Sequence, residues 1–288
     1  MTSLFPAMSS TIDLHCGSGL QRSGGPAFAW DVDPSVIDDL FESGRPADSD
    51  ALPLDLWQEE GRLEVVKTGR HRTVYRLELS GDRPDNVLYI KRYRAADWKA
   101  RWRRHIRGAT ARREHRSMVA VAGLGIPTAK VVAVGGPLWP GHNQDSWLVT
   151  VGVPDAKPLD ELLADADSGL DPIERRLVVG QVAEIIARLH DAGLWHRDLH
   201  SGNFLVQQSA GRLPRPVLID LYPVVGRRPT VARRLDGLAR LAAALGSSVT
   251  PSERWLFLER YLEVCEPVEA NVARRRDWAS RASGSPTS

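Results

Sequence analysis

The chain of 288 residues has few cysteines and no long apolar run, and each absence excludes a class of protein. Cys16 and Cys265 are its two cysteines, far apart in sequence, which excludes a disulfide-rich scaffold and a cysteine-rich zinc site. No apolar stretch approaches the roughly 20 residues that span a bilayer, and the start lacks a basic segment followed by an apolar core. We therefore expect a cytoplasmic protein with reduced thiols.

The strongest functional signal is the segment HRDLHSGNFLV at residues 196–206, followed by the apolar run VLID that ends at Asp220. Asp198 and Asn203 stand five positions apart in a predicted loop, and Asp220 closes a short predicted strand, as in protein-kinase-like enzymes. Asp198 can orient a substrate hydroxyl and accept its proton, while Asn203 and Asp220 offer the oxygen ligands that Mg²⁺ requires. A chance His-Arg-Asp triplet in a surface turn is the alternative, which the later Asn and Asp disfavour.

Lys91 and Glu114 are the candidate nucleotide-positioning pair. Lys91 ends a predicted strand over residues 87–91 and can neutralise the α- and β-phosphates of a nucleotide if a carboxylate holds it in place. Glu114 is the candidate carboxylate, because it lies in a predicted helix over residues 111–122 whose apolar positions recur at helical spacing. A lysine at a strand end is commonly solvent-exposed and has no functional role. The position of Lys91 before Asp198 in the chain, and its spacing from it, favour the functional interpretation.

The loop expected to cover the phosphates is the weakest of these signals. Residues 63–67 and 73–79 are predicted as two strands of a hairpin, whose connection contains one glycine, Gly69, where protein kinases carry three. Backbone N–H groups at Gly69 can approach a phosphate, and Arg70 can add side-chain donors. A plain exposed hairpin is the alternative.

Taken together, these motifs resemble those of the bacterial lipopolysaccharide kinase family. The resemblance covers roughly residues 61–245 and rests on YIKRY at 89–93, ARRE at 111–114, GLGIPT at 123–128, HRD at 196–198 and LIDL at 218–221. It implies a protein-kinase-like fold and ATP-dependent phosphorylation of a sugar hydroxyl on a lipid-linked saccharide, a core heptose or Kdo. It also implies a place at the cytoplasmic face of the inner membrane.

The expected fold is α+β and two-lobed, protein-kinase-like, with a small β-rich N-lobe containing one main helix and a larger helical C-lobe. The predicted parts are an N-terminal extension over residues 1–55, an N-lobe over 56–151, a C-lobe over 152–275 and a loose tail over 276–288. We expect residues 1–25 to be disordered and residues 34–41 to form a short helix. Residues 152–158 would connect the lobes, and adenine would lie against this connection.

Helical spacing of apolar residues predicts the main C-lobe helix over 173–189, with Ile173 on its apolar face. Further helices are predicted over residues 159–163, 233–245 and 255–262. Asp236 resembles the buried Asp that braces the catalytic loop in kinase-like folds, although stabilisation of a helix N-terminus explains it equally well. The short connection after Asp220 leaves little room for a phosphorylation-switched loop.

Residues 91–116 are strongly basic, with eleven Lys or Arg against Asp97 and Glu114, and Trp98 and Trp102 interrupt them. Basic side chains near anionic head groups contribute about 1 kcal/mol each, and indoles favour the membrane boundary. We therefore expect this segment to make peripheral contact with an anionic inner membrane or with a phosphorylated glycolipid. A solvated charged face is the alternative, and we expect no nucleic-acid partner because the kinase motifs already account for anionic ligands.

Three functions are compatible with these motifs. The favoured function is an ATP- and Mg²⁺-dependent kinase acting on a lipid-linked saccharide or lipopolysaccharide precursor. A kinase of a protein or a soluble small molecule is the alternative. A non-catalytic kinase-like binding module is disfavoured, because Lys91, Asp198 and Asp220 are all present.

Overall fold

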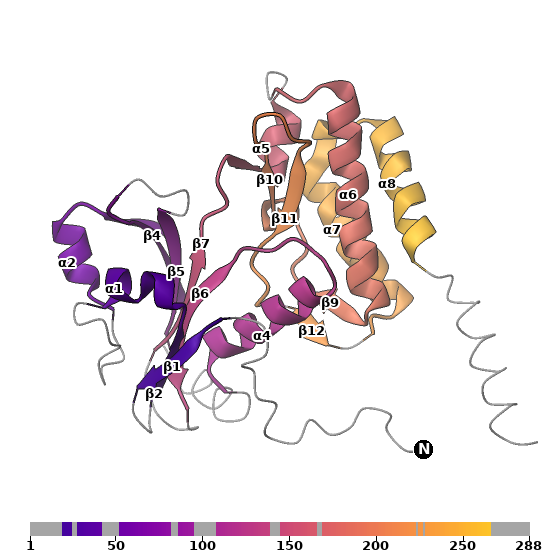
Figure 1. The fold of residues 1–288 in the computed structure, drawn as a ribbon. Helices are drawn as coiled ribbons and strands as arrows, with labels where there is room; N and C mark the ends of the chain where they lie inside the picture. The colour runs from indigo at the N-terminus through magenta and orange to yellow at the C-terminus, as the bar shows by residue number, and fades with distance from the viewer. Residues whose placement is uncertain are drawn as a thin grey trace, which may run out of the picture. The chain divides into compact units, whose positions relative to one another are not determined.

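The structure is a computed structural model, and it describes residues 19–24, 28–41, 52–81, 86–94, 108–138, 145–165, 169–222, 224–226 and 228–265. The chain divides into two compact units (Figure 1). Unit 1 is Met1–Val119 with Ala129–Pro154, and unit 2 is Ala120–Thr128 with Asp155–Ser288. Unit 1 is built on a β-sheet and unit 2 is largely helical, which confirms the predicted fold class. The predicted domain boundaries stay predictions, and the tail over residues 276–288 lies outside the described residues.

Unit 1 contains a seven-stranded antiparallel sheet with the strand order β1-β2-β6-β7-β5-β4-β3. Its strands are β1 (Gln21–Gly24), β2 (Phe28–Val32), β3 (Leu63–Thr68), β4 (Arg72–Glu78), β5 (Val87–Tyr93), β6 (Val131–Pro137) and β7 (Ser146–Val151). Its helices are η1 (Pro34–Val36), α1 (Ile37–Leu40), α2 (Leu54–Glu59) and most of α4 (Thr110–Gly123). Buried aromatic and aliphatic side chains from both halves of the sheet form one core, among them Trp30, Leu88, Ile90 and Trp147.

Strands β1 and β2 were not predicted, and β1 lies within the segment expected to be disordered. Trp30 of β2 is fully buried and packs edge-on against Phe41, with ring centroids 5.2 Å apart. Gly135 of β6 lies opposite Trp30, and a Cβ atom on Gly135 would be 2.6 Å from the indole. The hairpin could not be predicted from the sequence, because β1 has no buried apolar residue and both faces of β2 are buried. Neither strand therefore shows the alternation of apolar and polar residues that predicts a strand.

Asp31 of β2 ties the hairpin to α4. Its carboxylate accepts a hydrogen bond from Arg22 Nε at 2.9 Å and another from Arg112 Nη1, and Arg112 Nη2 donates to the Ala29 carbonyl at 2.6 Å. Burial raises the pKa of Asp31, but the hydrogen bonds and charges of the two arginines outweigh it, so its pKa lies below the ordinary value. The carboxylate is therefore ionised at neutral pH and holds the start of α4.

Unit 2 combines helices with two small sheets. Its helices are α5 (Leu159–Ala164), α6 (Pro172–Asp191), η2 (Ser201–Asn203), α7 (Val231–Leu245), η3 (Gly246–Ser248) and α8 (Pro251–Val264). Strands β8 (Ala156–Pro158), β10 (Phe204–Gln207) and β11 (Arg215–Leu218) form one sheet, and β9 (Leu194–His196) and β12 (Val224–Gly226) form the other. Every helix among the described residues is too short or too polar to cross a bilayer.

In unit 2 one strand was not predicted and one expectation was wrong. Residues 156–158, expected in the connection between lobes, form strand β8, because they pair with β10 in an antiparallel register. Ile173, expected on the apolar face of α6, is 78% exposed. It is the second residue of α6, in the exposed first turn after the N-cap Asp171, and the buried face of the helix begins at Val178.

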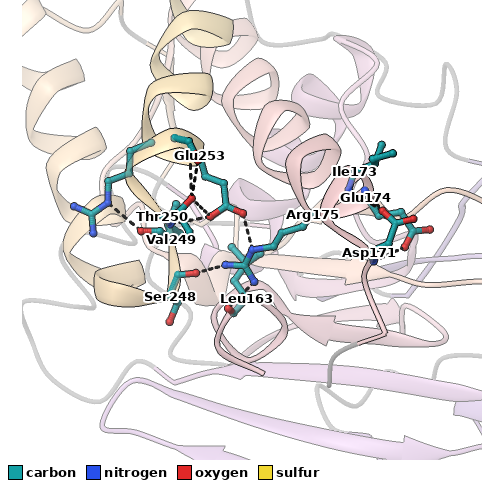
Figure 2. Close-up of polar contacts among 11 residues, drawn as sticks. Leu163, Asp171, Ile173, Glu174, Arg175, Ser248, Val249, Thr250 and Glu253 are labelled. Carbon is teal, nitrogen blue, oxygen red and sulfur yellow. Dashed lines mark hydrogen bonds and ion pairs between the residues drawn. The ribbon is translucent and has the colours of Figure 1, made fainter. Parts of the chain in front are cut away.

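Arg175 of α6 joins three neighbouring elements of unit 2 (Figure 2). Its guanidinium donates to the Leu163 carbonyl at 2.8 Å, to Glu253 Oε1 at 2.5 Å and to the Ser248 carbonyl. Glu253 also accepts from the Thr250 backbone N–H at 2.8 Å, which completes a capping box at the start of α8. The Arg175 guanidinium therefore fixes the ends of α5 and η3 and the start of α8 to the long helix α6.

His190 of α6 makes the stability of unit 2 depend on pH. It is buried, its Nδ1 lies 2.8 Å from the Tyr261 hydroxyl, and burial together with the charge of Arg234 lowers its pKa to about 4. As the pH falls below 6.5, the histidine binds a proton in the unfolded chain but not in the folded one. The free energy of unfolding therefore decreases until the pH reaches about 4. Between pH 7 and pH 5, the wild type should lose about 2 kcal/mol more unfolding free energy than a His190→Gln variant. Urea titrations at both pH values measure this, and equal losses in the two proteins would contradict it.

Candidate active site

The structure contains the predicted ion pair between Lys91 and Glu114, both in unit 1. Lys91 Nζ lies 2.6 Å from Glu114 Oε1, and the carboxylate is fully buried. The predicted strand ended at Lys91, but β5 continues to Tyr93, so the lysine lies inside a strand that pairs with both β4 and β7. A buried carboxylate without a partner is costly, so Glu114 must keep Lys91 close and thereby fixes its ammonium group.

Tyr93 is a further member of this cluster, and no sequence motif indicated its role. Its hydroxyl donates a hydrogen bond to Glu114 Oε2, so both carboxylate oxygens of Glu114 are engaged. Tyr93 follows Lys91 by two residues on the same strand, and residues at this spacing point to the same face of a sheet. That spacing was the signal by which the sequence could have revealed it.

The Gly69 hairpin is held by hydrogen bonds of its own. The Gly69 N–H donates to the Arg72 carbonyl at 2.8 Å, and the Gly69 carbonyl accepts from Arg94 Nη2 at 2.7 Å. Arg94, the residue after β5, also donates to Thr73 Oγ1 at 2.9 Å and so holds the turn from a second side. Arg70 is exposed at the tip of the turn. The phosphate contacts predicted for Gly69 and Arg70 stay predictions.

The catalytic-loop motif forms a rigid turn within unit 2. The loop leaves β9 at His196, exposes Asp198, buries Leu199 and enters η2. The Asn203 side-chain oxygen accepts from the His200 backbone N–H at 2.9 Å, and the Asn203 N–H returns to the His200 carbonyl at 3.1 Å. Asp198 therefore lies exposed in a loop that strand β9 holds before it and the His200–Asn203 hydrogen bonds hold after it.

Asp220 and Asn203 lie at the same end of the β10–β11 pair. Phe204, which follows Asn203, is opposite Leu218, and the Ile219 N–H donates to the Asn203 carbonyl at 2.8 Å. Asp220 has a φ of 56°, in the left-handed region that residues other than glycine rarely adopt but Asp tolerates. Such conformations persist where the surrounding structure imposes them, and they cluster at functional sites.

His196 fixes the backbone of Asp220. Its Nε2–H donates to the Asp220 carbonyl at 3.0 Å, and burial lowers the pKa of the imidazole, so the ring is neutral at physiological pH. His196 therefore supports the loop directly through this hydrogen bond. Asp236, by contrast, does not brace this loop: it lies on the solvent side of α7, is 55% exposed and pairs with Arg240 at 3.2 Å. The bracing interpretation of Asp236 was wrong, because its helical position faces away from the buried residues of α7.

The donor set of unit 2 suits a magnesium ion. The Asp220 carboxylate and the Asn203 amide oxygen are hard ligands, and the Asn203 oxygen keeps a second lone pair besides the one used by His200. Among the described residues, no group of three or more His, Cys, Asp or Glu is placed to hold a metal alone. Mg²⁺ takes one or two protein ligands and completes its shell with phosphate and water.

The fold of the chain is kinase-like. A solved structure of WaaP in complex with acyl carrier protein resembles the chain with a TM-score of 0.53 and 24% identity, covering 79% of this chain and 91% of that chain. This likeness shows the fold. No curated protein has significant sequence similarity to the chain.

Residues 55–261 match the lipopolysaccharide kinase (Kdo/WaaP) family, and this is more than half of the chain. The chain therefore belongs to that family, which confirms the resemblance drawn from its motifs. It is a phosphotransferase that uses ATP to phosphorylate a sugar hydroxyl of the lipopolysaccharide core.

Proposed function

We propose that the enzyme transfers the γ-phosphoryl group of ATP, with Mg²⁺, to a hydroxyl of a heptose or Kdo residue in a lipid-linked core saccharide. The observation that carries this proposal is the buried Lys91–Glu114 ion pair, because an ammonium group fixed in this way is suited to bind nucleotide phosphates. The second support is the fixed catalytic loop that presents Asp198.

Each proposed site residue has one task in this reaction. Lys91 neutralises the α- and β-phosphates, and Gly69 and Arg70 cover them. Asp220 and Asn203 would hold Mg²⁺, which when bound offsets the negative charge of the phosphates. Asp198 orients the sugar hydroxyl and takes its proton as the oxygen attacks the γ-phosphorus. A new oxygen–phosphorus bond forms, the bond to the β-phosphate oxygen breaks, and ADP leaves.

The test is transfer of label from [γ-³²P]ATP with Mg²⁺ to purified envelope glycolipid, to the same glycolipid after delipidation, and to protein. Label on the glycolipid, with the phosphorylated sugar identified by mass spectrometry, is the expected result. Label on the delipidated core shows that the sugar suffices as acceptor. Label that appears on protein alone would overturn the proposal in favour of a protein kinase.

We also propose peripheral contact with the inner face of the inner membrane, on the basis of the basic segment over residues 91–116. Its central arginines, at positions 101, 103 and 104, lie outside the described residues, so this proposal rests on sequence. Lys and Arg near an anionic surface contribute about 1 kcal/mol each, and salt screens the attraction.

Changing Arg101, Arg103 and Arg104 to Ser should weaken sedimentation with phosphatidylserine vesicles by about 100-fold at low salt, because about 3 kcal/mol of attraction is lost. The matched control changes the tail arginines over residues 274–276 to Ser, which removes the same charge elsewhere. An equal loss in both variants would indicate a general charge effect, and no loss in the first would remove the membrane proposal.

A further inference from the structure

Two arginines of unit 2 gather around one indole beside the catalytic loop. The guanidinium carbon of Arg233 lies 4.9 Å from the Trp195 ring centroid, and that of Arg197 lies 5.8 Å from it. Both arginines are exposed, and Arg197 directly precedes Asp198. The two guanidinium carbons therefore lie within about 11 Å of each other.

Different elements of unit 2 hold these side chains in place. Trp195 is the central residue of β9 and pairs with Val225 of β12, so the indole belongs to a hydrogen-bonded ribbon. Arg233 lies in the first turn of α7, where its backbone N–H donates to the N-cap Thr230 at 3.4 Å. Stacking on an aromatic face orients a guanidinium but leaves its N–H donors available to a ligand.

Among the described residues, neither Arg197 nor Arg233 has a carboxylate within ion-pair distance. Neighbouring arginines do have one: Arg228 pairs with Asp191 at 3.7 Å, and Arg240 pairs with Asp236 at 3.2 Å. An anion at this indole would be attracted by both guanidinium groups. The N-terminus of α7 adds partial positive charge at the same place.

We propose that Trp195, Arg197 and Arg233 form an anion-binding subsite for the acceptor, which takes a carboxylate or phosphate group carried by the sugar that is phosphorylated or by its neighbour. This inference rests on the proposed function, since it assigns Asp198 to the acceptor hydroxyl. Arg197 and Asp198 are consecutive, with Cα atoms about 3.8 Å apart, so the subsite and the proposed base share one loop. The subsite selects acidic over neutral saccharides and sets the hydroxyl toward Asp198.

The test measures binding without turnover. Isothermal titration of the wild type compares the sugar acid Kdo, its carboxyl-reduced derivative and glucose 6-phosphate. We expect an acidic probe to bind at least tenfold more tightly than the reduced sugar, since guanidinium hydrogen bonds to anions are charge-assisted. Preference for Kdo or for the sugar phosphate tells whether a carboxylate or a phosphate is the natural group.

Arg233→Gln should weaken binding of the acidic probe about tenfold and raise the KM for the acceptor, with the KM for ATP unchanged. Arg240→Gln is the matched control, because it removes the same charge from the same helix at a paired arginine. Arg233→Lys should recover part of the binding, because it restores charge without the planar fork. No preference of the wild type for acidic probes, or equal losses in Arg233→Gln and Arg240→Gln, would overturn the subsite.

Failure of the subsite and failure of the proposed function are distinguishable. If labelled glycolipid forms but Arg233→Gln binds the acidic probe normally, the subsite alone is wrong. If no glycolipid is labelled while the arginine variant still loses the acidic probe, the anion site stands and the assigned reaction is wrong.

Discussion

An Asp198→Asn enzyme should transfer phosphate roughly 100- to 10,000-fold more slowly than the wild type, because the amide cannot accept the proton of the attacking hydroxyl. Asp198 is exposed, and the hydrogen bonds that fix its loop come from Asn203 and His200. The substitution should therefore leave folding unchanged. Initial rates of labelled transfer, with thermal melting measured alongside, separate the two effects.

Asp236→Asn provides the matched control for this experiment. It makes the same chemical change at an exposed Asp of unit 2, whose described partner is Arg240 on its own helix. We expect this variant to retain full activity. Phosphotransfer by Asp198→Asn at the rate of this control would refute the assigned base.

Lys91→Met should lower kcat/KM for ATP by about 100- to 1,000-fold, the usual loss when one preorganised donor to developing charge is removed. It should also destabilise unit 1, because Glu114 is left buried with the Tyr93 hydroxyl but without its cation. A double variant, Lys91→Met with Glu114→Gln, should recover much of the stability and none of the activity. Steady-state kinetics and denaturant titrations on the same preparations measure both quantities.

Lys130→Met is the control for this pair, because it removes an exposed lysine that pairs with Asp33 at 3.2 Å in the same unit. It should change neither KM nor kcat. If Lys91→Met retained a normal kcat/KM for ATP while folded, Lys91 would be a structural lysine and the nucleotide assignment would fail.

The Lys91–Glu114 pair could be predicted because each residue lies in an element with a clear apolar pattern and a known order along the chain. The catalytic loop could be predicted because Asp198, Asn203 and Asp220 are close in sequence, and their spacing carries the information. Strand β2 could not, since its partner β6 is about 100 residues away and its own residues, buried on both faces, show no alternation.

The sequence by itself determined the kinase-like class, the helices with strong apolar periodicity and the residues proposed for chemistry, because these depend on residue types at short fixed spacings. Tertiary structure decided which side chains meet. It placed the Tyr93 hydroxyl on Glu114, turned Asp236 and Ile173 to solvent, and brought Arg233 to the indole of Trp195. Such contacts join residues on separate elements or depend on which face of an element is covered, and both are fixed by packing rather than by local spacing.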